Sequence, residues 1–240
     1  MKTGKKLYLS QGAGNIPDDK PMVFWDTCAL LDIVRIPVRK NLGINDLECY
    51  ERIADCIERE EVVSITSGLV VREFTDHYEE EHGKLLHAQT SLKNVVGDYA
   101  DYMESITKKE RIKKGVALLN VEHRLVCVLS RILRHTFVLR EEAVYNRFAD
   151  YRVRHKMAPA AHKQEYKDCY IWGTFLELIH KLEPVSSYIA FMTTNKEDYQ
   201  KGNDLFPQLV ADCYKPSMHV VLHIGQLRGG IDAALNPPQI

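Results

Sequence analysis

The chain lacks the patterns that mark membrane, secreted and zinc-stabilised proteins. No apolar run approaches the roughly 18 residues that are needed to cross a bilayer. The positive start, residues 1–6, is followed only by Leu7-Tyr8-Leu9, which is too short for the apolar core of a signal peptide. The six cysteines include no C-x-x-C pair, which argues against a structural zinc site and a disulfide framework. We therefore expect a cytoplasmic protein with reduced thiols and no membrane partner.

Signatures of several catalytic chemistries are missing as well. The chain has no phosphate-binding loop of the G-x-x-x-x-G-K type and no G-x-S-x-G serine motif. His77 and His82 are five residues apart, so they do not share a helix face as the histidines of H-E-x-x-H do. Cys28 lies two residues after Asp26, where phosphatases with an aspartyl nucleophile have a second Asp. Cys28 and Cys169 adjoin acidic residues, but their spacing reveals no Cys-His pair.

Charge is close to balanced overall and uneven along the chain. The net charge of the 240 residues is −1, and the 45% hydrophobic and 27% charged residues are ordinary for one globular domain. Residues 108–163 nevertheless contain fourteen Lys and Arg against five Asp and Glu, a local charge of +9, so the rest carries −10. A basic face beside an acidic pocket suits a polyanionic substrate. Solvated amphipathic helices would explain the same charge, and both interpretations stay open.

Short apolar runs alternate with helical periodicity, which predicts an α/β fold with a parallel sheet and right-handed crossovers. Asn45 is a candidate helix cap with Glu48 in a capping box, and Ser67 is a candidate cap for the helix after the second strand. We expect residues 1–20 to be a loosely held arm and residues 225–240 a surface tail. The expected strands are 22–25, 62–66, 137–139, 188–193 and 219–224, and the expected helices are 45–60, 84–107, 115–136, 141–156, 168–182 and 204–213.

Four acidic residues stand where an expected strand hands over to a loop or helix. Asp26 follows the first strand, Glu73 comes just after the second, Asp168 opens an apolar helix, and Asp198 follows the strand at 188–193. The carboxyl ends of parallel strands form one crevice, in which ligands bind. Carboxylates that meet there repel one another unless a cation neutralises them, and a hard divalent cation, Mg²⁺ or Mn²⁺, prefers oxygen ligands. The pattern predicts a metal-dependent phosphodiesterase, and among these enzymes we expect a nuclease.

Each acid also has an ordinary explanation. Asp26 could cap the next helix, and Asp168 could favour the positive end of its helix. Glu73 could be an exposed helix residue, and Asp198 could belong to a turn. What favours a site is that all four coincide at strand exits.

Four segments, in this order, resemble the PIN-domain family of metal-dependent ribonucleases. The segments are residues 23–32 (VFWDTCALLD), 70–74 (VVREF), 167–172 (KDCYIW) and 191–199 (FMTTNKEDY), and the resemblance covers roughly residues 21–224. It is greatest to the larger PIN-like proteins. It implies a three-layer α/β/α fold with strand order 3-2-1-4-5, here with a helical insertion at about residues 84–136. The insertion would be a lid, a substrate clamp or an oligomer interface.

The resemblance also implies the roles of individual residues. Asp26, Glu73 and Asp168 match the family's metal-binding acids, which would act in catalysis together with Asp198. At the fourth position the chain has Asn195 where many members have Asp, so Asn195 would bind the metal through its carbonyl or hold a metal-bound water. Cys28 replaces the family's usual Asn, while Thr27 keeps a hydroxyl that could orient Asp26 or a substrate phosphate. These departures put a second metal in doubt more than the first.

The implied activity is hydrolysis of a phosphodiester by a water that one or two Mg²⁺ or Mn²⁺ ions activate. RNA is preferred over DNA as the substrate, and a homo-oligomer or a regulatory protein partner is left open. The rival hypothesis is a catalytically silent PIN-like module that binds nucleic acid or a protein. Candidates for holding the nucleic-acid backbone lie just upstream of Asp168, and they are Arg147, Arg152, Arg154, Lys156 and Lys163.

Overall fold

A parallel sheet holds the most apolar short segments of the chain. The computed structural model describes residues 6–7, 16–39, 44–107, 121–163, 165–183 and 185–237. Every residue of three central strands is buried, as is typical of parallel strands that are covered on both faces. The five central strands are β2 (Met22–Trp25), β3 (Val63–Ser67), β4 (Thr136–Leu139), β5 (Ile189–Met192) and β8 (Met218–Val221). Their order is β4-β3-β2-β5-β8, which is 3-2-1-4-5 when the five are numbered along the chain, as expected.

The sheet has a sixth strand that the sequence did not predict. β1 (Lys6–Leu7) pairs in parallel with β4, so that Lys6 is opposite Val138 and Leu7 opposite Leu139. The prediction that residues 1–20 form only an arm is therefore wrong at this point. Two residues are too few to produce a periodic apolar pattern, and their strand exists only because β4 offers a free edge.

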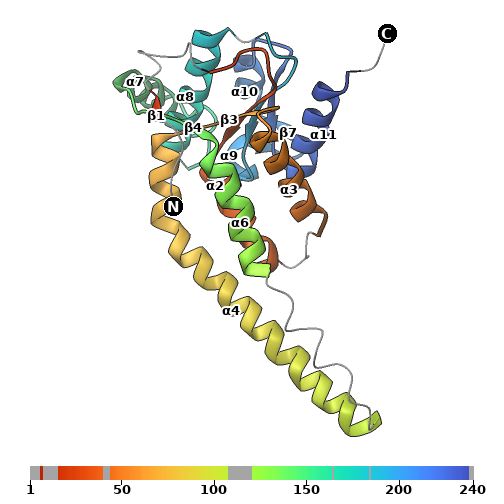
Figure 1. Ribbon diagram of the computed structural model, residues 1–240. Coiled ribbons are helices and arrows are strands. Elements are labelled where there is room, and N and C mark those ends of the chain that lie inside the picture. Colours follow the sequence, from red (N-terminus) through yellow and green to blue (C-terminus); the bar gives the residue numbers. More distant parts are fainter. Residues whose placement is uncertain are drawn as a thin grey trace.

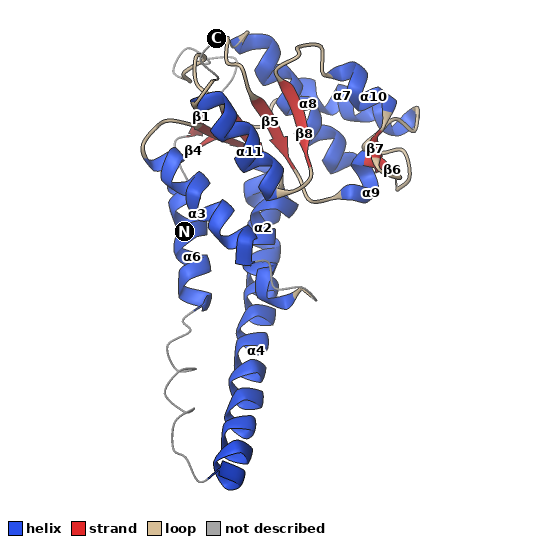
Figure 2. Ribbon diagram, turned by 90° about the vertical axis from the view of Figure 1, so that its right-hand side faces the viewer, coloured by secondary structure: helices blue, strands red, loops and turns tan. Residues whose placement is uncertain are grey.

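Helices cover both faces of the sheet (Figures 1 and 2). One layer contains α2 (Thr27–Arg35), α3 (Ile44–Glu58), α6 (Val121–Arg134) and α11 (Ile224–Leu235), and the other contains α7 (Ala143–Arg154), α8 (Tyr166–Leu182) and α10 (Pro207–Asp212). Figure 2 shows β5 and β8 between α11 on one side and α8 and α7 on the other. None of the described helices is both long and apolar enough to span a membrane.

The longest helix starts earlier than expected. Residues 84–107 do not form a helix of their own, because they are the outer part of α4 (Gly68–Thr107), a single helix of 40 residues. Ser67 caps it as predicted, since the Ser67 hydroxyl accepts from Val70 N at 3.2 Å. The acidic stretch 76–81 contains no Gly or Pro, so nothing in it ends the helix. The outer part of α4 extends far beyond the sheet and its helical layers (Figure 1).

Other boundaries also differ from the sequence-based expectation. α6 buries Leu125, Leu129 and Ile132 against the body, so this part of the expected insertion belongs to the main helical layer, while residues 115–120 lie outside the described part. The expected tail contains α11, whose Leu227 and Ile231 are buried. Asn45 lies inside α3, which begins at Ile44, and is not its cap. A short hairpin of β6 (Gln200–Lys201) and β7 (Asp204–Leu205) was not expected.

The strand order creates a switch point at the carboxyl edge of the sheet, the position of the ligand crevice in open α/β sheets. From β2 the chain builds β3 and β4 on one side, and it later returns to build β5 and β8 on the other. Loops that leave β2 and β5 therefore diverge, and ligands of open α/β sheets bind where they separate. Trp25, the last residue of β2, is aligned with Met192, the last residue of β5. The next residues in the chain, Asp26 and Thr193, therefore emerge side by side.

Candidate functional site

Asp26 is fixed at the exit of β2 by its own backbone. Asp26 N donates to Met192 O at 3.0 Å, and its carboxylate Oδ1 accepts from Thr27 N at 2.7 Å, which caps α2. The capping role that the sequence allowed for Asp26 is therefore present. The cap uses the Oδ1 oxygen of Asp26 and leaves Oδ2 for other partners.

The second oxygen of Asp26 has two side-chain donors. Oδ2 accepts from Thr193 Oγ1 at 2.6 Å and from Cys28 Sγ at 2.9 Å. Burial raises the pKa of Asp26, the hydrogen bonds from Cys28, Thr193 and Thr27 lower it, and the charge of Glu73 raises it further. Burial and the Asp26 charge also raise the pKa of the Cys28 thiol well above its usual value. Cys28 is thus a hydrogen-bond donor to Asp26, and a reactive thiolate is disfavoured at this position.

Glu73 joins the crevice from the second turn of α4. Its Oε2 accepts from Thr27 Oγ1 at 2.8 Å, so one hydroxyl links Glu73 to the loop that carries Asp26. Its Oε1 lies 3.0 Å from Lys167 Nζ, at the start of α8. Glu73 is thereby positioned by two segments that are distant from it in the sequence.

Asp168 enters from the first turn of α8. Aromatic packing fixes this helix on the sheet, since the Trp172 ring lies 5.1 Å from that of Phe191 and the Phe175 ring 5.7 Å from that of Phe24. The pKa of Asp168 is raised to about 8, first by burial and then by the charges of Asp26, Asp198 and Glu73. The four carboxyl groups are therefore near enough to act on one another.

Asn195 and Asp198 complete the acidic side of the crevice. Asn195 precedes α9 (Lys196–Tyr199), and its Nδ2 donates to Asp198 Oδ2 at 2.6 Å and to Asp168 Oδ2 at 3.4 Å. Asn195 N donates to Thr193 Oγ1 at 3.1 Å, so Thr193 connects the loop after β5 with Asp26. Asp198 is buried, and its Oδ1 has no hydrogen-bond partner among the described residues. A buried acceptor without a donor is costly, so Asp198 Oδ1 would be stabilised by a donor or a cation that reaches it.

The donor set is suited to a hard divalent cation, although it is not assembled as a finished metal site. In the described part of the chain, no three His, Cys, Asp or Glu side chains are grouped closely enough to hold an ion. Hydroxyl, thiol and amide donors stand between the carboxylates, namely Thr27, Thr193, Cys28 and Asn195. The acceptors are all carboxylate oxygens, the type that Mg²⁺ and Mn²⁺ prefer. The buried, unpaired oxygen of Asp198 and the repulsion by neighbouring carboxylates at Asp168 both favour a cation.

The basic residues predicted to bind substrate have different environments. Arg147, Arg154 and Lys156 are exposed on or just after α7. Lys163 is exposed and pairs with Glu197 at 2.6 Å, one residue before Asp198. Arg152 is buried, and its guanidinium donates to Ala158 O and to the Asp212 carboxylate.

The expectation that Arg152 contacts a substrate is therefore corrected. Its charge is already paired inside the protein, and the side chain reaches no solvent. Arg152 links α7 to α10 through Asp212. The other, exposed cations remain predicted candidates for binding of substrate.

Two further residues of the crevice were not singled out from the sequence. Thr193 holds Asp26 and the Asn195 backbone at once, and Lys167 faces Glu73. A weak signal exists for both, because Thr193 is the first residue after a buried strand and Lys167 immediately precedes Asp168. Neither position reveals its partner until the strands are aligned.

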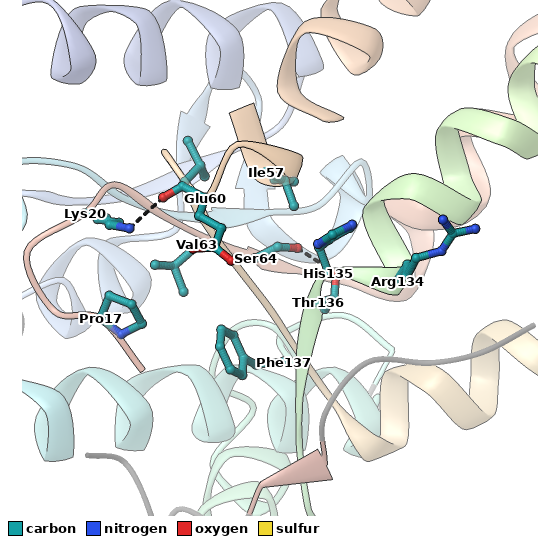
Figure 3. A pocket seen from close by; sticks show the side chains of 11 residues that line it. Pro17, Lys20, Ile57, Glu60, Val63, Ser64, Arg134, His135, Thr136 and Phe137 are labelled. Carbon is teal, nitrogen blue, oxygen red and sulfur yellow. Dashed lines mark hydrogen bonds between the residues drawn. The ribbon is translucent and has the colours of Figure 1, made fainter. Parts of the chain in front are cut away.

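A cavity elsewhere in the molecule is separate from this crevice. It measures about 350 Å³ and lies at the opposite, amino-terminal edge of the sheet, where β3 and β4 begin (Figure 3). Ser64 and Thr136 form its polar floor, and Lys20 Nζ donates to Glu60 O at 2.7 Å on its rim. Its lining includes none of the four acids, so this cavity is not part of the candidate site.

Comparison of the chain with protein-family models, with curated proteins and with solved structures found no match. The functional interpretation therefore depends on the geometry of the crevice itself.

Proposed function

We propose that the protein is a PIN-like, metal-dependent nuclease that hydrolyses phosphodiester bonds of single-stranded RNA. The observation that carries this proposal is that four acids from separate segments are linked at the switch point of the sheet. Thr27, next to Asp26, donates to Glu73, and Asn195 donates to both Asp168 and Asp198. The strand order adds support, because 3-2-1-4-5 is the order that the sequence resemblance implies. A group of carboxylates that includes a buried, unpaired acceptor is costly in a metal-free protein, since the carboxylates repel one another.

Mg²⁺ or Mn²⁺ would be held by Asp26, Glu73 and Asp168, with Asp198 or Asn195 at the fourth position. When bound, such a cation polarises a phosphate oxygen and makes a water molecule more acidic. The proposal needs no covalent enzyme intermediate, in keeping with the raised pKa of the Cys28 thiol.

In this proposal the chain's own residues orient the carboxylates and bind the phosphate. Thr27 and Thr193 hold the Glu73 and Asp26 carboxylates in fixed positions through hydrogen bonds of 2.8 and 2.6 Å. Lys167 and Lys163 are exposed cations at the rim, and each reaches a carboxylate of the crevice or its neighbour. A phosphate that approaches the acids would attract both lysines, which bind phosphate as point charges.

The test is cleavage of single-stranded RNA and single-stranded DNA with Mn²⁺, with Mg²⁺ and with EDTA. We expect cutting of RNA that needs the metal and that Asp26→Asn reduces by more than about 100-fold, the upper range for loss of a mere supporting partner. Asp19→Asn is the matched control, because Asp19 is exposed and precedes β2 at the other edge of the sheet. A well-folded wild type that cuts neither strand with either metal would contradict the proposal.

A second function is favoured by one feature of the crevice. Asn195 supplies an amide that bridges Asp168 and Asp198, where a further carboxylate would add charge for a second cation. A catalytically silent module that binds nucleic acid or a protein would need no such charge. Thermal unfolding with and without Mn²⁺ separates the two, since binding of the ion to the folded protein raises Tm. No change of Tm at millimolar Mn²⁺ would favour the silent module.

A further inference from the structure

The acidic crevice contains one positive charge of its own. Lys167 Nζ lies 3.0 Å from Glu73 Oε1, and among the described residues no other ion pair involves any of the four acids. The other groups that donate to these carboxylates are neutral hydroxyl, thiol, amide and backbone N–H groups. Lys167 is therefore the one full positive charge that the described part of the chain places on the crevice.

Lys167 stands against the preference of its own helix. It is the second residue of α8, and the amino-terminal turn is the positive end of a helix, where a further cation is disfavoured. Lys181, in the last turn of α8, has the favourable position for a lysine. The carboxylate of Glu73, which comes from α4, offsets the unfavourable position of Lys167. The crevice explains this lysine better than the stability of α8 does.

The two members of the pair are held with unequal firmness. The Glu73 side chain is only 14% exposed, and its Oε2 accepts from Thr27 Oγ1 at 2.8 Å. The Lys167 side chain is 59% exposed, and Glu73 is its only ion-pair partner among the described residues. A long, exposed ammonium side chain can turn away at little cost, whereas a buried and doubly bonded carboxylate stays in place. Lys167 is therefore the member of the pair that can leave.

A divalent cation bound by Glu73 would compete with Lys167 for the same carboxylate. Two positive charges a few ångströms apart repel each other, so the bound cation would displace the ammonium group. The displaced ammonium would remain at the first turn of α8, next to Asp168. A phosphate drawn to the cation would meet it there, and lysine binds phosphate as a point charge.

We propose that Lys167 is a mobile counter-ion, which neutralises Glu73 in the metal-free protein and moves to the substrate phosphate when a divalent cation replaces it. This role rests on the proposed function, because the nuclease supplies both the cation and the phosphate. Loss of Lys167 should therefore have two effects of opposite sign, since the cation loses a competitor and the RNA loses a contact. A residue that only maintained the fold would weaken both kinds of binding when removed.

Binding of Mn²⁺ to the full chain, measured by the loss of the EPR signal of free Mn²⁺, tests the first effect. Lys167→Met should bind Mn²⁺ about 3–10-fold more tightly than the wild type, because a partly buried ion pair no longer opposes the cation. Lys167→Arg keeps the charge and should bind Mn²⁺ no more tightly than the wild type. The matched control is Lys181→Met, which breaks the pair with Glu177 at 3.2 Å on the same helix and should leave the Mn²⁺ affinity unchanged.

The kinetics of RNA cleavage test the second effect. At saturating Mn²⁺, Lys167→Met should raise the KM for single-stranded RNA at least about threefold and change kcat less, since a phosphate contact is lost. Lys181→Met should leave the KM unchanged. Circular dichroism verifies that each variant is folded, and Lys167→Gln serves if the methionine variant is not.

The outcomes separate this role from the proposed function. A wild type that binds no Mn²⁺ would overturn both. A wild type that binds Mn²⁺ at least as tightly as Lys167→Met does would overturn the role of Lys167 alone. Tighter Mn²⁺ binding by Lys167→Met with an unchanged KM would overturn the transfer of Lys167 to the phosphate.

Discussion

At the scale of single residues, the crevice is a set of carboxylates that hydrogen-bond donors separate. The carboxylates nevertheless interact electrostatically with one another. Thr27 and Thr193 each place a hydroxyl on a carboxylate, and Asn195 places its amide between two more. Burial works against ionisation of Asp26 and Asp168, and hydrogen bonds recover part of that cost at Asp26. We therefore expect the site to respond to pH and to the loss of a single hydroxyl.

The raised pKa of Asp168 predicts how the metal-free protein responds to pH. Its pKa is about 8 in the folded protein against an ordinary value of 3.8, so the folded state keeps a proton that the unfolded chain releases. The contribution of this proton to the free energy of unfolding is present in full below about pH 4. It is lost as the pH rises through about 8. We expect urea unfolding in EDTA to show falling stability from pH 5.5 to pH 9. The fall should be smaller in Asp168→Asn, with the exposed Asp204→Asn as the control. An unchanged pH slope in Asp168→Asn would refute this account.

Loss of the Thr193 hydroxyl should disturb the site more than the fold. Thr193→Val removes the donor to Asp26 Oδ2 and the acceptor for Asn195 N while keeping the side-chain shape. We expect metal-dependent cleavage to fall about 10–100-fold, the range for partners that orient metal-binding groups. Thr174→Val is the matched control, because Thr174 is a buried threonine on α8 whose hydroxyl donates only to Tyr170 O. Equal losses of activity in both variants would mean that Thr193 acts through general stability.

At the scale of elements, the close contact of α7 and α8 fixes the helix that carries Asp168. Gly173 permits this contact, because a Cβ at this position would lie 2.6 Å from Phe148 Cδ1. The Phe148 ring is in turn stacked below Arg152, whose carbon Cζ is 4.9 Å from the ring centre. A Cβ at position 173 therefore requires Phe148 to shift, and the constraint comes from packing, since Gly173 lies within an ordinary helix.

Two alanine substitutions separate packing from helix propensity. Gly173→Ala should lower the free energy of unfolding by about 1–3 kcal/mol, as overpacking of a filled interface does. Gly97→Ala, in the outer part of α4, should raise helix stability by up to about 1 kcal/mol, because no atom lies within 4 Å of a Cβ there. Chemical unfolding of both variants beside the wild type measures the difference. Destabilisation by both changes would show that α4 has neighbours at Gly97 in solution.

At the scale of the whole molecule, charge is divided between two regions. The acids meet at the carboxyl edge of the sheet, and exposed cations lie on α7, which packs against α8 beside that edge. A polyanion could contact both regions if a cation neutralised the crevice. Arg147 and Arg154 are the exposed arginines of α7 that carry this expectation.

Removing these two charges should weaken RNA binding and its dependence on salt. Arg147→Ala with Arg154→Ala should lower the slope of log affinity against log salt by about 0.7 for each phosphate contact that is lost. Arg59→Ala with Arg134→Ala makes the same change in net charge on exposed residues at the end of α3 and α6, and it should have a smaller effect. Binding of a fluorescent single-stranded RNA in EDTA-free buffer at several salt concentrations gives the slopes. Identical slopes for the two pairs would exclude a specific role for α7.

The sequence alone determined the five central strands and the positions of the acids relative to them. Strands buried on both faces are short apolar runs, and the residue that follows such a run must emerge at an edge, as Asp26 does. The capping of α4 by Ser67 was also predictable, because it depends on atoms three residues apart. The order of β4, β3, β2, β5 and β8 agrees with the order that the resemblance implied.

Only the tertiary structure decided which residues those acids meet. Thr193 reaches Asp26 across 167 positions of sequence, and Arg152 reaches Asp212 across 60, so no local pattern distinguishes either residue from an ordinary neighbour. For the same reason the sequence missed β1 and α11, which are stable because other elements offer them an edge or a face. Local periodicity predicts the elements, since hydrogen bonding and side-chain spacing act over a few residues. Which side chains contact one another is decided only by the fold, because contact energy depends on distance in space.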